Sequence, residues 1–67
     1  MEIFSKRIKE LRLLKGLYQS DVAEGTGFSQ TAIARWEAGD RLASIEAVVK
    51  LAKFFGVSTD YLLGVED

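Results

Sequence analysis

The residues of this chain best suited to chemistry lie between positions 30 and 36, where amide, hydroxyl and guanidinium groups are interspersed with apolar side chains. A helix here turns by about 100° per residue, which places Ile33 and Trp36 together on one face. The opposite face then carries Gln30, Thr31, Ala34 and Arg35. An amide, an arginine and small side chains on a helix face can approach a DNA major groove closely and hydrogen-bond to base edges.

A second short helix and a tight turn would position this face. Residues 19–24 predict a helix whose inner side carries Val22 and Ala23. Gly27 accepts a positive φ without steric cost, so the chain can turn sharply there. Ser29 is a favourable N-cap for the following helix, because its hydroxyl can accept a free backbone N–H. Two helices joined in this way form a helix-turn-helix.

A longer helix is predicted before this motif, over residues 3–15. Its apolar stripe consists of Phe4, Ile8, Leu11 and Leu14. Gly16 ends it in a left-handed conformation, and Leu17 can supply the hydrophobic contact that often accompanies such an end.

The C-terminal part of the chain predicts two more helices. Ser44 caps the first and Gly56 closes it. Its apolar stripe consists of Ile45, Val48, Leu51, Ala52 and Phe55. Ser58 caps a last short helix through Leu63, and Gly64 stops it. Because no segment alternates as a β-strand does, we predict an all-α, compact five-helix bundle that contains the helix-turn-helix.

The composition fits one small domain over residues 1–67. A chain of 67 residues, 48% of them apolar, lies near the lower size limit for independent folding. Without cysteine it forms no disulfide. No apolar run approaches the roughly 20 residues of a membrane span, and the N-terminus lacks the apolar region of a signal peptide. We therefore expect a cytoplasmic protein without a membrane partner.

Catalysis is not expected. The chain has no histidine and no cysteine, which removes the usual general base and the soft metal ligands. The glycines at 25 and 27 lack the preceding strand and the Gly-Lys-Ser/Thr ending of a phosphate-binding loop. We predict no metal, no cofactor and no small-molecule ligand.

The charge distribution leaves two interpretations open. The formal charge is −1 and the pI is about 5.3, whereas DNA-binding domains usually carry a basic excess. Acids dominate the C-terminal end, where Glu66 and Asp67 are last. Five of the nine basic residues gather in the first fifteen positions: Lys6, Arg7, Lys9, Arg12 and Lys15. This basic run forms either a local positive patch that attracts DNA or a solvated helix face.

The sequence resembles the XRE-type helix-turn-helix domain of phage repressors and Cro proteins over nearly its entire length. The matching segments are IKELRLLKGLYQSDVAEGTGFSQTAIARWEAGDR and KLAKFFGVSTDYLLG. Their most specific parts are Gln19-x-x-Val22-Ala23, Gly27-x-Ser29, Ile33-x-Arg35-Trp36-Glu37-x-Gly39 and Gly56-Val57-Ser58. The resemblance implies a prokaryotic or phage-encoded repressor of transcription. Such a regulator would read the major groove with helix 30–36, as a dimer on a palindromic operator.

The resemblance also implies roles for individual residues on DNA. Gln19 would touch a phosphate and brace Gln30. Gln30 could then pair with adenine, and Arg35 with guanine or with a phosphate; an ordinary surface position is the alternative for both. Thr31 and Ala34 could meet thymine methyl groups, although Ala34 fits equally well as a helix-favouring spacer. Contacts that position the DNA backbone are expected from Tyr18, Gln19, Ser29 and Arg41.

Five other residues are expected to be structural. The family buries an arginine–glutamate pair at the positions of Arg12 and Glu37, which would tie the first helix to the end of the third. Removing either partner would leave a buried charge at a cost of about 3–5 kcal/mol. Trp36 is expected to pack in the core, and Gly27 and Gly39 to serve the geometry of the backbone.

Several positions depart from the family pattern. Tyr18 replaces a small N-cap residue and gives up a cap worth ~1 kcal/mol. Asp40 and Leu42 occupy loop positions that are often basic or polar in the family, and Ala43 replaces a frequent proline. Fewer loop cations should weaken non-specific DNA affinity, which is mainly phosphate neutralisation.

Self-association and the extent of the protein are further expectations. Leu42 can form an apolar patch with Leu63 and Val65, which suits a two-fold contact between copies. Because three modest side chains bury less than the roughly 800 Å² per partner of a stable interface, we expect a weak homodimer that double-stranded DNA favours. The alternative is a protein-interaction module, such as an antitoxin-like one, on the same fold with weak or lost DNA binding. The chain is either a full small regulator or the N-terminal part of a longer one.

Overall fold

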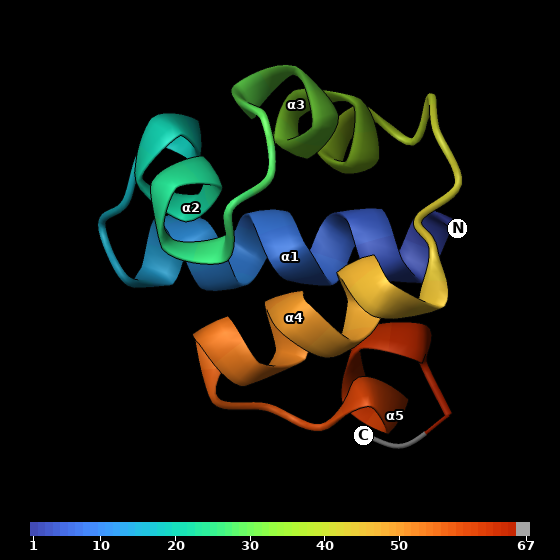
Figure 1. The fold of residues 1–67 in the computed structure, drawn as a ribbon. Coiled ribbons are helices and arrows are strands. Elements are labelled where there is room, and N and C mark those ends of the chain that lie inside the picture. Colours follow the sequence, from blue (N-terminus) through green and yellow to red (C-terminus); the bar gives the residue numbers. More distant parts are fainter. Residues whose placement is uncertain (66–67) are drawn as a thin grey trace.

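The computed structural model describes residues 1–65, which form five helices joined by short connections (Figure 1). Glu66 and Asp67, the acidic end noted above, lie outside the described residues. The helices are α1 (Glu2–Leu14), α2 (Gln19–Thr26), α3 (Gln30–Ala38), α4 (Ile45–Phe55) and α5 (Thr59–Leu63). No strand occurs within residues 1–65, so the predicted all-α bundle is confirmed.

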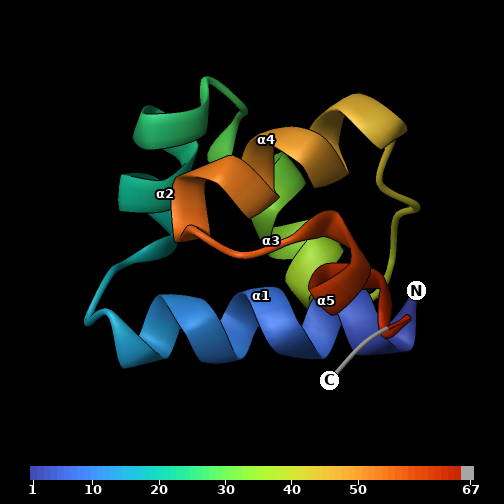
Figure 2. The ribbon, with the colours of Figure 1, turned by 90° about the horizontal axis from the view of Figure 1, so that it is seen from below.

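Helix α1 lies along one edge of the bundle, and the other four helices pack on the same side of it (Figure 2). In the view of Figure 1, α2 and α3 lie above α1, whereas α4 and α5 lie below it. α2 also packs directly against α4. The view from below shows α5 beside the N-terminal half of α1, with α4 extending from α5 towards α2 (Figure 2). The N-terminus, the loop over residues 39–44 and α5 therefore gather at one end of the molecule. None of the helices within residues 1–65 is long and apolar enough to cross a membrane.

The core receives buried apolar side chains from all five helices. Its members are Phe4, Ile8, Val22, Ala23, Ala32, Ile33, Trp36, Ala47, Val48, Leu51, Ala52, Phe55 and Leu62. Leu11 of the predicted stripes is half-buried and packs against this core. Two other stripe residues lie outside it, since Leu14 is 83% exposed and Ile45 is 86% exposed. Leu14 ends α1 and Ile45 begins α4, so each lies where the helix extends past its neighbours.

The helix ends follow the local signals of the sequence. The serine caps predicted at positions 29, 44 and 58 are present, each accepting the backbone N–H three residues further on. The predicted left-handed end of α1 is also present, because Gly16 has φ +68° and the Leu17 N–H bonds to the Arg12 carbonyl at 3.0 Å. α2 and α3 run two residues beyond their predicted ends, up to the left-handed residues Gly27 and Gly39.

Candidate nucleic-acid interface

The turn between α2 and α3 has its own hydrogen bonds. Gly27 has φ +81°, and its N–H bonds to the Ala23 carbonyl at 2.9 Å. The Thr26 hydroxyl donates to the Val22 carbonyl at 2.7 Å and accepts the Phe28 N–H at 3.4 Å. Because the left-handed conformation costs glycine little, the sharp turn predicted at Gly27 forms without strain. This geometry sets the direction in which α3 leaves the turn.

Apolar contacts seat the inner face of α3. Ile33 is 1% exposed and Trp36 is 5% exposed, so both belong to the core as expected. Phe28 meets Trp36 edge to face, with ring centroids 5.1 Å apart and an interplanar angle of 89°. The Trp36 Nε1–H has no hydrogen-bond partner within residues 1–65. With this face buried, the opposite face of α3 is presented outward.

The outer face of α3 carries most of the predicted base-reading residues. Gln30 and Thr31 are exposed in the first turn, and Arg35 is exposed one turn further along. Ala34, expected on the same face, is half-buried and therefore offers less surface than its neighbours. Arg35 forms no ion pair within residues 1–65, so its guanidinium is available to another acceptor.

A buried ion pair joins α1 to the C-terminal turn of α3. Arg12 Nε lies 2.7 Å from Glu37 Oε2, and Arg12 Nη2 donates to Glu37 Oε1 at 2.9 Å. The two side chains are 11% and 5% exposed, so the pair implied by the family resemblance is present. Arg12 Nη1 also donates to the Leu17 carbonyl at 2.9 Å. The hydrogen bond to Glu37 is the main cause that raises the pKa of Arg12, against the opposing effect of burial.

The start of α2 differs from the expectation for Gln19. Gln19 Nε2 donates to Glu37 Oε1 at 3.3 Å, whereas the expected partner was Gln30. The carboxylate of Glu37 is a charged acceptor and attracts the amide more strongly than a neutral amide would. Gln19 is thereby tied to the same ion pair that supports α3. The expected bracing of Gln30 by Gln19 is therefore wrong for this structure of the free domain.

Tyr18 is 76% exposed at the N-terminus of α2 and makes no side-chain cap hydrogen bond, as predicted. Its backbone N–H donates to Asp21 Oδ2 at 2.7 Å. Asp21 thus supplies half of a capping box from the third position of the helix, which compensates in part for the missing small N-cap. The Ser29 hydroxyl accepts the Ala32 N–H at 3.1 Å, and its own proton remains available to a phosphate.

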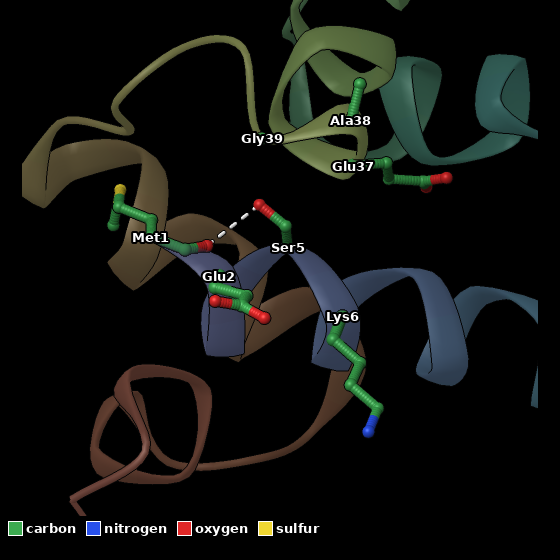
Figure 3. Close-up of a pocket in the computed structure, with 7 residues that line it drawn as sticks. All are labelled: Met1, Glu2, Ser5, Lys6, Glu37, Ala38 and Gly39. Atoms are coloured by element: carbon green, nitrogen blue, oxygen red, sulfur yellow. Dashed lines mark hydrogen bonds between the residues drawn. The ribbon is translucent and has the colours of Figure 1, made fainter.

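The C-terminus of α3 is seated on the N-terminal half of α1 (Figure 3). Gly39 has φ +79° and lies above Ser5, whose hydroxyl donates to the Met1 carbonyl at 2.9 Å. A hollow of about 440 Å³ lies between these segments. Figure 3 shows the Lys6 and Glu37 side chains pointing away from it in different directions, so they do not converge on a shared point in the hollow.

The loop after α3 brings its exposed residues close to the N-terminus of the chain. Asp40, Arg41 and Leu42 are exposed, and the Ala43 N–H lies 3.0 Å from Met1 Sδ. Arg41, expected to contact the DNA backbone, forms no ion pair within residues 1–65. The acidic side chain of Asp40 stands directly beside it in the sequence.

An apolar face surrounds the N-terminus at this end of the molecule. Its exposed members are Met1, Ile3, Leu42, Ile45, Leu63 and Val65. Met1, Ile45 and Leu63 also line a hollow of about 290 Å³ between α4 and α5. The sequence indicated Leu42, Leu63 and Val65 alone. The prediction that Ile45 belongs to the buried stripe of its helix is wrong. Its place directly after the Ser44 cap is the signal in the sequence that it could face outward.

The bundle and its outward-facing α3 define the class of the protein as a helix-turn-helix domain. A family model described as helix-turn-helix matches residues 8–62, and the chain belongs to the XRE-type helix-turn-helix family. The crystal structure of the restriction-modification controller protein C.AhdI from Aeromonas hydrophila has the same fold, with a TM-score of 0.85 and 31% identity. That match covers 91% of this chain and 92% of the other.

Two transcriptional regulators are among the most similar sequences. The transcriptional activator BcrR of Enterococcus faecalis is 38% identical over 64 residues, which make up 96% of this chain and 31% of BcrR. The phage CTXphi transcriptional repressor RstR of Vibrio cholerae is 40% identical over 55 residues, or 82% of this chain and 50% of RstR. This chain thus spans slightly under a third of BcrR and half of RstR.

Proposed function

We propose that this domain binds double-stranded DNA at specific sequences and acts in the repression of transcription, without catalysis. The observation that carries the proposal is the exposed outer face of α3, with Gln30, Thr31 and Arg35, on a helix held from behind by core contacts and by the Arg12–Glu37 pair. Amide and guanidinium groups on a rigid helix can pair bidentately with adenine and guanine in the major groove. The domain would act in the cytoplasm of a prokaryotic cell, as a bacterial or phage regulator does.

The residues around α3 would position the DNA backbone. Gln19, Tyr18 and Ser29 lie at the starts of α2 and α3, where helix N-termini favour phosphate. Arg41 in the following loop supplies a cation. Base contacts would then determine which DNA sequence is bound, whereas the backbone contacts would set the orientation of the domain on the duplex.

A protein-interaction module on the same fold is the competing function, favoured by the net charge of −1 and by Asp40 beside Arg41. A titration with mixed-sequence duplex at about 50 mM salt separates the two. We expect salt-dependent binding, followed by enrichment of one motif when the protein selects sites from random duplexes. No binding at low salt would support the protein-interaction module instead.

The apolar face supports a second part of the proposal, a two-fold homodimer favoured by DNA. A stable interface buries roughly 800 Å² per partner, and the domain exposes 4214 Å² in all. The six exposed side chains of the apolar face form a modest surface, so we propose a weak dimer in solution. On a palindrome with half-sites about 34 Å apart, contact between the two copies would raise the affinity of each for its half-site.

We expect Leu42→Asp to lower the cooperativity of binding to a palindrome and to leave affinity for a single half-site unchanged. Leu42 is 78% exposed on the apolar face, and a carboxylate facing its own copy across a two-fold axis would repel it. Leu14→Asp is the matched control, since Leu14 is 83% exposed at the far end of α1. Unchanged cooperativity in Leu42→Asp, or a tight dimer at nanomolar concentration without DNA, would contradict the proposal.

A further inference from the structure

Helix α5 depends on its neighbours for its position. It has five residues, too few for a helix that is stable alone, and Leu62 is its one fully buried side chain. The same helix carries Leu63, and Val65 follows two residues later. Whatever holds α5 against the bundle therefore also places two members of the apolar face.

Arg7 of α1 makes two contacts with α5. Its guanidinium carbon lies 4.2 Å from the centroid of the Tyr61 ring, and its Nη1 donates to the Tyr61 carbonyl. That carbonyl also accepts the Gly64 N–H at the end of the helix. A planar guanidinium can stack flat on a ring and donate hydrogen bonds in its own plane at the same time. A cation at the C-terminal turn of a helix is also favourable for the helix dipole.

A second contact lies one turn away on the same helix. Ile3 precedes Arg7 by four residues, so both side chains lie on the same face of α1. Gly64 has φ +77°, and a Cβ built there would lie 2.9 Å from Ile3 Cγ2. The chain that leaves α5 is therefore pressed against α1. Ile3, a member of the apolar face, thus packs against Gly64 next to the contact between Arg7 and Tyr61.

We infer that Arg7 is a positioning residue for self-association, acting through Tyr61 on α5. The inference rests on the proposed dimer and names what holds its contact surface in place. Arg7 belongs to the basic run of the first fifteen residues, for which the sequence allows either a patch that attracts DNA or a solvated helix face. In the structure Arg7 is half-buried. It lies against α5, which is below α1 in the view of Figure 1, whereas α3 is above it. Arg7 is thus engaged within the domain by α5, and its loss should leave the α3 surface intact.

Three variants and a control test this role. Arg7→Gln and Tyr61→Leu each remove the cation–π contact, whereas Tyr61→Phe keeps the ring. Lys9→Gln removes one nearby positive charge from an exposed position on α1. We expect Arg7→Gln to speed hydrogen exchange of the α5 amides roughly tenfold, because the loss of one partly desolvated cation–π contact makes local opening of α5 easier. Exchange in α3 should stay the same.

The decisive measurement is binding to a half-site and to a palindrome. We expect Arg7→Gln and Tyr61→Leu to lose cooperativity several-fold with half-site affinity unchanged, while Tyr61→Phe and Lys9→Gln behave as the unaltered protein. Retained cooperativity in both disruptive variants, or an equal loss on half-site and palindrome, would overturn the inference. Specific half-site binding by the unaltered protein checks the proposed function separately.

Discussion

Arg12→Met is expected to lower the free energy of unfolding by about 3–5 kcal/mol, because it leaves the Glu37 carboxylate buried without its cation. Glu37 is 5% exposed in the pair, so water cannot replace the two hydrogen bonds it would lose. The Gln19 amide at 3.3 Å is its other donor, and it carries no charge. In a domain of this size each kcal/mol lowers Tm by roughly 4–8 °C, so the melting temperature should fall by more than about ten degrees.

A double-mutant cycle shows whether the loss belongs to the pair. Arg12→Met with Glu37→Leu replaces both charges by apolar groups and should recover much of the loss. Recovery should be incomplete, since the Leu17 carbonyl also loses its bond from Arg12 Nη1. Lys15→Met is the matched control, as Lys15 is an exposed cation just after α1. Additive losses from the two single changes in thermal melts would contradict the coupling.

The fold could be predicted from the sequence because its helix boundaries are local. Ser29, Ser44 and Ser58 cap helices through bonds that reach three residues along the chain. The exposure of Leu14 and Ile45 was not predictable in this way. Periodicity assigns a residue to one side of a helix, but burial needs another element opposite that residue. Both residues lie at a helix terminus, where no neighbouring element within residues 1–65 covers the side chain.

In the candidate site, too, features set by local sequence could be predicted, whereas contacts between distant segments could not. The outer face of α3 follows from the helical period alone, so the exposure of Gln30, Thr31 and Arg35 was predictable. Side-chain partners far apart in the sequence were not. The Arg12–Glu37 pair came from the family resemblance, and neither the Gln19–Glu37 bond nor the Arg7–Tyr61 contact could be read from spacing. Each depends on how α1, α2 and α5 are placed in space.

Arg35→Ala is expected to weaken binding to the preferred operator by about 1–3 kcal/mol and to relax the preference at one base pair. Gln30→Ala should do the same at a different base pair, since the two side chains are more than one helical turn apart on α3. Both are exposed on the outer face, so the folded domain should keep its Tm. Binding is measured on the selected operator, on its single-base variants and on random duplex.

Gln19→Ala is the contrasting change in the same experiment. Gln19 lies at the start of α2 beside Glu37, so it can position a phosphate without facing a base. A contact of this kind is shared by all sequences, and its loss should weaken operator and random duplex alike. Lys53→Ala controls for charge, because Lys53 is an exposed cation on α4. If Arg35→Ala instead costs the same on operator and random duplex, Arg35 contacts a phosphate, and base reading by α3 rests on Gln30 and Thr31.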